Sequence, residues 1–97
     1  MTEQPSLSFA GLVRQLRGEV NLTQEELAQA AGLSPRAVSD LERGINRTAR
    51  KTTAVQLAAA LGLADPVSDV FVEAARGRAP ASSVLTALGT GDRNLAG

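Results

Sequence analysis

The stretch from Leu22 to Gly44 constrains the fold more than any other part of the chain, because it encodes two short helices and a tight turn. Thr23 is a good N-cap, and Glu26 follows three residues later, so the two side chains can form a capping box. Gly32 supplies the left-handed residue that ends a helix. The pair Ser34–Pro35 then offers an N-cap and a proline at the first helical position, where a missing N–H costs nothing.

Two helices joined by only three residues must cross steeply, so the side chains at their crossing must be small. Ala28 and Gly32 meet that need. Such a unit is a helix-turn-helix, whose second helix can lie in the major groove of DNA. The pattern therefore indicates DNA as a candidate ligand.

Here the sequence resembles the phage-repressor (Cro/CI, or Xre) family, because residue types and spacings agree over the whole stretch. The matching residues are Gln24, Leu27, Ala28, Gly32, Leu33, Ser34, Val38, Ser39, Leu41, Glu42 and Gly44. The resemblance implies an all-α, five-helix, lambda-repressor-like DNA-binding domain over roughly Phe9 to Arg76. Its helix-turn-helix would lie at the second and third helices.

Apolar side chains at helical spacing predict the other three helices. The first runs from about Phe9 to Glu19, and the fourth starts near Thr52 or Thr53. The fifth has Asp65 as its N-cap and Pro66 as its first residue. The predicted inward faces are Phe9, Leu12, Val13 and Leu16 in the first, Ala54, Leu57, Ala58 and Leu61 in the fourth, and Val67, Val70, Phe71 and Ala74 in the fifth. The sustained alternation that is typical of strands is absent.

We expect three parts in the chain. Residues 1–7 form a polar lead, residues 8–77 form the helix-turn-helix domain, and residues 78–97 form a tail that is richer in Gly, Pro, Ala and Ser. The tail is either flexible or forms a short helix near residues 83–88. In the first case it is a loose end or a linker, and in the second it offers a dimer or protein-partner contact.

The residue types present narrow the chemistry. The chain has no Cys and no His, which removes disulfides, thiolate metal sites, and the commonest metal ligand and general base. No spacing of the carboxylates suggests a paired acid–base site, a metal cage or a phosphate loop. No apolar run approaches the length of a membrane span, and the first residues lack the form of a signal peptide. We therefore expect a cytoplasmic, non-enzymatic protein without metal or cofactor.

Charge is unevenly distributed along the chain, although the formal net charge is zero. Residues 34–51 carry five basic and two acidic side chains, whereas the segments on either side are net acidic. The positive segment is the one that a helix-turn-helix would place against DNA. The zero total predicts weak non-specific binding, because that binding comes from phosphate neutralisation.

The resemblance implies that the N-terminal end of the third helix reads the major groove. The residues implicated by their positions are Ser34, Pro35, Arg36, Ala37, Ser39 and Asp40. Arg36 is the best base reader, because a guanidinium can bond the O6 and N7 atoms of guanine together. Pro35 can offer only an apolar contact, for example to a thymine methyl group. Asp40 could accept from cytosine N4, hold Arg36 in place, or form an ordinary solvated pair with Arg36.

A second set of residues is implicated in contacts with the DNA backbone, namely Gln24, Arg43, Asn46, Arg47, Arg50 and Lys51. Gln24 opens its helix, where free backbone N–H groups favour the same phosphate. The basic residues adjoin the reading helix, although a charge run can also be an ordinary solvated face. The resemblance further implies an ion pair between Arg17 and Glu42. Its role would be structural, tying the first helix to the third.

These observations favour a sequence-specific, non-catalytic transcriptional regulator, with repressor as the preferred role. It would bind double-stranded DNA as a homodimer on half-sites about one helical turn apart. Dimerisation would use the fifth helix, the tail, a region outside the chain, or Val55 if this residue points outward. The alternatives are a protein-interaction module, an antitoxin-like protein that binds both DNA and a toxin, and the N-terminal head of a larger regulator.

Overall fold

The computed structural model describes residues 8–45 and 48–88 of the chain. The helices in this part are α1 (Phe9–Glu19), α2 (Gln24–Ala31), α3 (Pro35–Glu42), α4 (Lys51–Ala60) and α5 (Val67–Ala75), and residues 82–88 form a further helical segment. No strand occurs among the described residues. The predicted all-α fold with a helix-turn-helix at α2 and α3 is therefore confirmed. The segment at residues 82–88 adds a sixth helical stretch to the five helices of the predicted domain, in the part of the tail where a short helix was one alternative.

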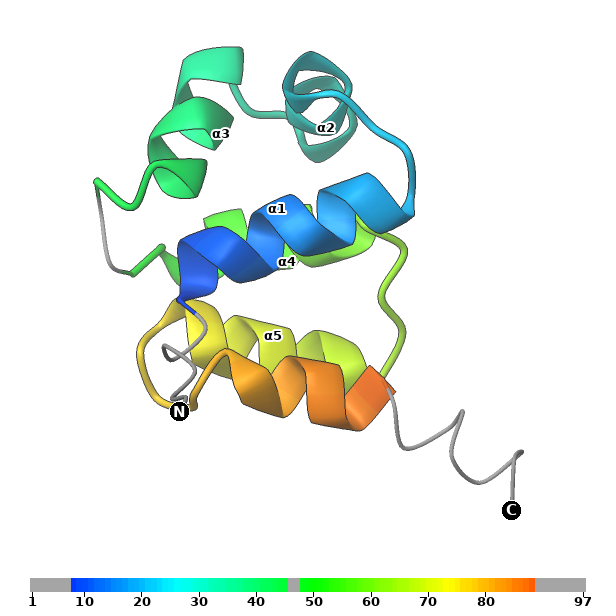
Figure 1. The fold of residues 1–97 in the computed structure, drawn as a ribbon, viewed down its shortest axis with the longest axis vertical. Coiled ribbons are helices and arrows are strands. Elements are labelled where there is room, and N and C mark those ends of the chain that lie inside the picture. The colour runs from blue at the N-terminus through cyan, green and yellow to red at the C-terminus, as the bar shows by residue number, and fades with distance from the viewer. Residues whose placement is uncertain (1–7, 46–47, 89–97) are drawn as a thin grey trace, which may run out of the picture.

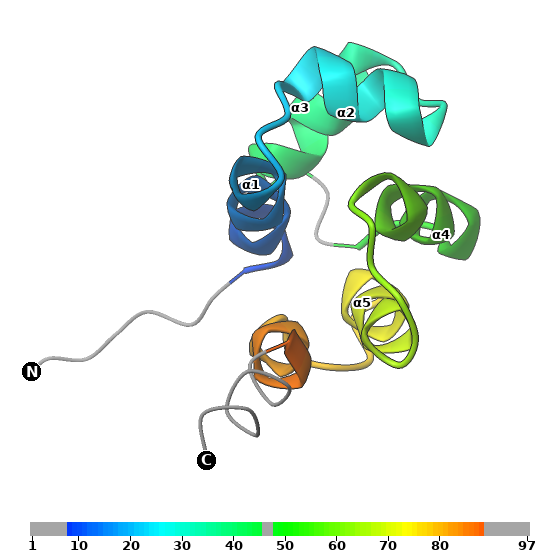
Figure 2. The same ribbon diagram turned by 90° about the vertical axis from the view of Figure 1, so that its right-hand side faces the viewer.

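The helices are stacked along the longest axis of the molecule (Figures 1 and 2). The pair α2 and α3 forms one end, α1 and α4 lie in the middle, and α5 with residues 82–88 forms the opposite end. α3 packs against α1 and α2, and α4 packs against α2 and α5. The helix-turn-helix is therefore presented at one end of the molecule rather than enclosed by the other helices.

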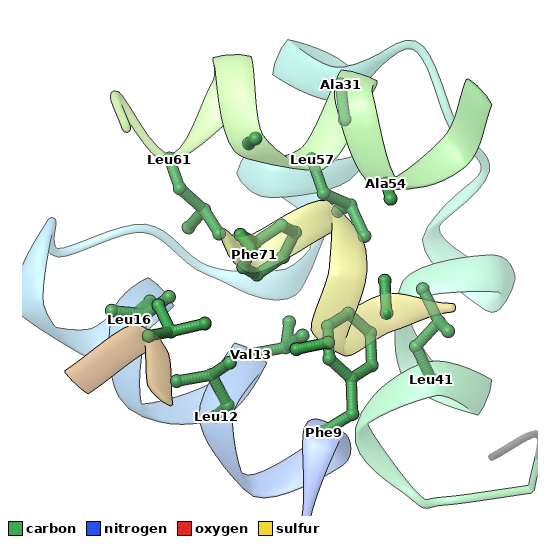
Figure 3. Close-up of a cluster of buried hydrophobic side chains, with 14 of the residues drawn as sticks. Phe9, Leu12, Val13, Leu16, Ala31, Leu41, Ala54, Leu57, Leu61 and Phe71 are labelled. Carbon is green, nitrogen blue, oxygen red and sulfur yellow. The ribbon is translucent and has the colours of Figure 1, made fainter. Parts of the chain in front are cut away.

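A largely aliphatic core holds these helices together (Figure 3). Phe9 of α1 and Phe71 of α5 pack with their ring centroids 5.2 Å apart. Leu12 of α1 and Leu57 of α4 are fully buried in the same cluster. All the residues predicted to face inward from the first and fourth helices are buried, which confirms the predicted rotation of both helices.

The caps predicted for the central pair of helices are present. The Thr23 hydroxyl accepts the Glu26 N–H at 3.0 Å, and the Glu26 carboxylate accepts the Thr23 N–H at 2.9 Å, which completes the capping box. Gly32 ends α2 with a φ of 73°, a left-handed conformation that glycine adopts at little cost. The Ser34 hydroxyl then accepts the Ala37 N–H at 3.1 Å and starts α3. Both helix ends at the turn are thus fixed by local interactions.

The predicted start of α5 is wrong by one residue. The helix begins at Val67, and Pro66 occupies the N-cap position without a side-chain hydrogen bond. If Asp65 were the N-cap, its side chain would accept a hydrogen bond from a backbone N–H of the first turn, such as that of Ser68. The Ser68 N–H instead donates to the Ala64 carbonyl at 3.0 Å. A backbone acceptor has therefore taken the donor that the Asp65 side chain would have needed.

α4 also starts earlier than predicted, at Lys51 rather than at residues 52–53. Arg50 is at its N-cap position, where no side chain accepts a hydrogen bond. The residue before it is anchored to a distant helix end, because the Ala49 N–H donates to the Ala75 carbonyl at 2.7 Å. This long-range bond, which the local sequence does not reveal, sets where the chain enters α4.

The predicted stripe of α5 is confirmed at Phe71 and Ala74, but the buried face also includes Val72 and Ala75. Its buried residues are Phe71, Val72, Ala74 and Ala75, whereas Val67 and Val70 of the predicted stripe are only half-buried. The elements that pack against α5 account for this difference. α5 packs on α4, and residues 82–88 lie beside it on another side (Figure 2).

The segment after Gly77 contributes to the core. Ala81 is buried, and Val84 is fully buried in the same cluster as the side chains of α1, α4 and α5. Leu85 and Leu88 pack against that cluster from its edge. Of the two alternatives for the tail, its described part forms a helix, and this helix closes the end of the core away from α2 and α3.

We predict that Val84→Ala lowers the free energy of unfolding by about 2 kcal/mol, because it removes buried methyl groups and leaves a cavity. The matched control is Val20→Ala at the end of α1, where the residue is 43% exposed and the expected change is within about 0.5 kcal/mol. Urea denaturation of both variants measures the difference. Equal stability of the two variants would mean that residues 82–88 are not part of the cooperative core.

Candidate nucleic-acid interface

The N-terminal end of α3 is open to solvent. Ser34, Pro35 and Arg36 are exposed. On the opposite side of the same helix, Val38 is fully buried and Leu41 is buried, and both belong to the core. Packing of this inner face fixes the rotation of α3 about its axis, so the tip of the helix faces solvent.

The remaining residues predicted to read bases lie along the flank of α3. Ala37, Ser39 and Asp40 are half-buried. Nε of Arg36 lies 3.9 Å from Oδ2 of Asp40, one turn further along the helix. The structure therefore places the predicted base-reading residues on α3 and at its N-cap. It also brings the side chains of Arg36 and Asp40 close together.

A buried carboxylate joins α3 to the two preceding helices. Nε of Arg17 donates to Oε2 of Glu42 at 2.7 Å, and its Nη2 donates to Oε1 at 2.9 Å. The Glu42 side chain is only 1% exposed, and that of Arg17 is 22% exposed. The remaining guanidinium nitrogen of Arg17, Nη1, donates to the carbonyl of Leu22 at 3.0 Å. The ion pair that the sequence led us to expect is thus present and connects α1, the turn before α2, and α3.

The contact with Glu42 changes the pKa of Arg17. The pKa of Arg17 is raised above its ordinary value, chiefly by the hydrogen bond to Glu42. Burial acts in the opposite direction and lowers the pKa, and the charge attraction of Glu42 raises it further. Arg17 is therefore charged at neutral pH, and it compensates the charge of Glu42 at the end of α3.

Gln24 has a partner that sequence reasoning missed. Its Nε2 donates to Oε1 of Glu42 at 3.0 Å, so the first residue of α2 is tied to the last residue of α3. A primary amide carries two N–H donors, so this bond leaves the second donor for another acceptor. Glu42 could have suggested this contact, because a buried carboxylate has more acceptor positions than one guanidinium fills.

The residues predicted to contact the DNA backbone are only partly within the described chain. Arg43, Arg50 and Lys51 are all exposed. Asn46 and Arg47 lie outside the described residues. Together the exposed cations frame α3, since Arg43 follows its last turn and the other two begin α4.

A groove of about 410 Å³ lies between α3 and the start of α4. It is lined by Leu33, Ala37, Asp40, Leu41, Thr48, Ala49, Arg50 and Thr53. The groove therefore places Arg50 on the same side of the molecule as the flank of α3. Thr48 and Thr53 are polar groups in this groove that the sequence did not single out.

No group of three or more His, Cys, Asp or Glu side chains that could hold a metal ion occurs in residues 8–45 and 48–88. Within the same ranges, no helix is long and apolar enough to cross a membrane.

The steep α2–α3 crossing, the open tip of α3 and the buried pair beneath it define a helix-turn-helix domain of the phage-repressor type. The sequence profile of the family described as Helix-turn-helix matches residues 13–66. That match covers more than half of the chain, and the chain belongs to this family.

A curated relative extends the similarity beyond the matched range. The HTH-type transcriptional regulator PrtR of Pseudomonas aeruginosa is 37% identical over 85 residues, which make up 88% of this chain. The same alignment covers only 31% of PrtR, so the chain spans about a third of that relative.

Two solved structures share the fold. The clp gene regulator ClgR from C. glutamicum has a TM-score of 0.56 and 27% identity, over 71% of this chain and 91% of that one. A mutant of the restriction-modification controller protein C.Esp1396I has a TM-score of 0.55 and 24% identity, over 67% of this chain and 84% of that one. The second likeness concerns the fold alone.

We predict that Arg17→Met destabilises the protein by about 3 kcal/mol, because it leaves the Glu42 carboxylate buried without its cation. The double variant Arg17→Met/Glu42→Leu should recover most of that loss, since apolar groups can replace a buried pair with little cost. Thermal or urea unfolding measures both. Arg14→Met, on the exposed side of α1, is the matched control and should be near neutral.

A loss below about 0.5 kcal/mol in Arg17→Met would show that the pair does not hold α1 to α3. Additive losses in the double variant would show that the two side chains act independently.

Proposed function

We propose that this chain is the DNA-binding part of a transcriptional regulator that inserts the N-terminal end of α3 into the major groove. Repressor is the regulatory role that we favour. The observation that carries the proposal is the exposed tip of α3, held from below by the pair of Arg17 and Glu42. The family of the chain and the description of PrtR as a transcriptional regulator support it.

The charges around α3 also support DNA as the ligand. Arg36, Arg43, Arg50 and Lys51 are exposed near or beside α3. The carboxylate of Glu42 would oppose a polyanion, but it is buried and bonded to Arg17. The surface offered to DNA is therefore more positive than the zero net charge of the chain implies.

Within this proposal the residues divide by role. Base edges are read by Ser34, Pro35, Arg36, Ala37, Ser39 and Asp40, and the backbone is held by Gln24, Arg43, Asn46, Arg47, Arg50 and Lys51. Gln24 uses the amide hydrogen that is not given to Glu42. The hydrogen bond to Glu42 fixes where this second hydrogen points, so the contact with a phosphate is prepared before DNA arrives.

A short reading helix contacts only a few base pairs, so the proposal includes a homodimer on two half-sites about one helical turn apart. Val55 of α4 is 48% exposed and is one candidate for the dimer contact. The proposal further places the protein in the cytoplasm and assigns it no catalytic step. A protein partner bound through residues 78–97 belongs to the same proposal.

We expect the protein to select a sequence from a random pool of duplexes, and Arg36→Ala to weaken binding to that sequence by at least about tenfold. The reason is the loss of a bidentate contact with a base. Gel shifts at several salt concentrations measure the affinities. Arg14→Ala removes an exposed positive charge from α1 and serves as the control, with little effect expected.

Affinity of the unchanged protein should fall steeply as salt rises, because phosphate contacts release counterions. Binding that does not depend on salt, or no selected sequence at all, would contradict the proposal and favour an adaptor of protein partners.

A further inference from the structure

The side chains of α3 offer an unusually narrow choice of base contacts. The helix reads Pro-Arg-Ala-Val-Ser-Asp-Leu-Glu, and it contains neither Asn nor Gln. Those amides are the side chains that bond N6 and N7 of adenine in a bidentate manner. The only long donor on the helix is Arg36, whose guanidinium matches O6 and N7 of guanine. The chemistry of this helix therefore selects guanine over adenine.

Arg36 alone would be a poorly defined reader. Its side chain is 88% exposed, so in the free protein it can adopt many rotamers. Each rotatable bond that is fixed on binding lowers affinity, and a guanidinium that is free to turn can also settle on a phosphate. Selective reading of a base therefore needs a neighbour that limits where Arg36 points.

Asp40 is placed to be that neighbour. Its Oδ2 lies 3.9 Å from Nε of Arg36, on the same face of α3 one turn later. The Asp40 side chain is only 31% exposed, because it also lines the groove towards the start of α4. The less mobile member of the pair is thus the carboxylate. An acceptor on Nε leaves the two terminal Nη groups free to point forward as a fork.

We propose that Asp40 is a positioning residue for Arg36, and that the pair makes each half-site require guanine at the position facing Arg36. This inference rests on the proposed function. In water the exposed pair is weak. When the protein docks, water leaves the interface and the attraction between the two groups strengthens, so the pair orders Arg36 at the moment of reading.

The proposal predicts opposite changes in two affinities. Asp40→Asn removes a negative charge near DNA, so affinity for random DNA should rise by a few fold. Discrimination of guanine from adenine at the Arg36 position should fall from about tenfold or more to about threefold or less. A carboxylate that is only a solvated charge would change the affinities for both sequences equally and leave their ratio unaltered.

The experiment uses the full chain and duplexes selected from a random pool. Arg36→Ala first identifies the base pair that faces Arg36, as the position at which selection is lost. Gel shifts then give the specific and non-specific affinities of the unchanged protein, Asp40→Asn and Asp40→Glu. Asp40→Glu keeps a carboxylate within reach and should retain most of the guanine preference. Asp69→Asn, an exposed change of the same charge on α5, should alter neither affinity.

Three results would overturn the inference. The first is an unchanged guanine preference in Asp40→Asn. The second is a loss of preference at a neighbouring base pair alone, which would make Asp40 a direct reader of cytosine. The third is adenine as the selected base opposite Arg36. In all three, the unchanged protein still selects a sequence, so the proposed function survives. If the unchanged protein selects no sequence, the proposed function fails and the inference fails with it.

Discussion

One buried carboxylate, that of Glu42, connects the first three helices and sets how α3 is held. Glu42 accepts from Arg17 on α1 and from Gln24 on α2, so the last residue of α3 is held by the two helices that precede it. Removing either charge alone leaves the other without its partner. The same contacts fix the orientation of α3, whose far end carries the exposed residues. This cluster of hydrogen bonds therefore contributes, together with the packing of Val38 and Leu41, to both the stability of the fold and the orientation of α3.

The groups that we propose face DNA are separated from the groups that hold the fold. The interior of α3 is aliphatic, and its buried charge is neutralised within the protein. Its exposed tip carries a proline and an arginine. A helix with this division can exchange its surface residues without disturbing its packing. The cations that follow α3 are held in a different way, since a hydrogen bond from Ala49 to the end of α5 sets the entry into α4.

Local patterns in the sequence predicted most of the fold. The box of Thr23 and Glu26, the left-handed Gly32 and the cap at Ser34 act over three or four residues, so the sequence alone contains the information. Errors arose where distant segments decide the outcome. The start of α4 depends on the hydrogen bond from Ala49 to the Ala75 carbonyl at the end of α5, and the buried face of α5 depends on residues 82–88. The hydrogen bond between Gln24 and Glu42 joins residues that are far apart in the chain, so no local pattern predicts it. The ion pair between Arg17 and Glu42 is also long-range, and it was predicted only from the family resemblance.

The central claim is that the tip of α3 lies in the major groove against guanine. Methylation interference on a selected duplex tests it most directly, because guanine N7 faces the major groove and adenine N3 faces the minor groove. The account predicts that methylation of guanine N7 within each half-site abolishes binding, while methylation of adenine N3 there has little effect. Binding that tolerates N7 methylation and is blocked by N3 methylation would contradict it.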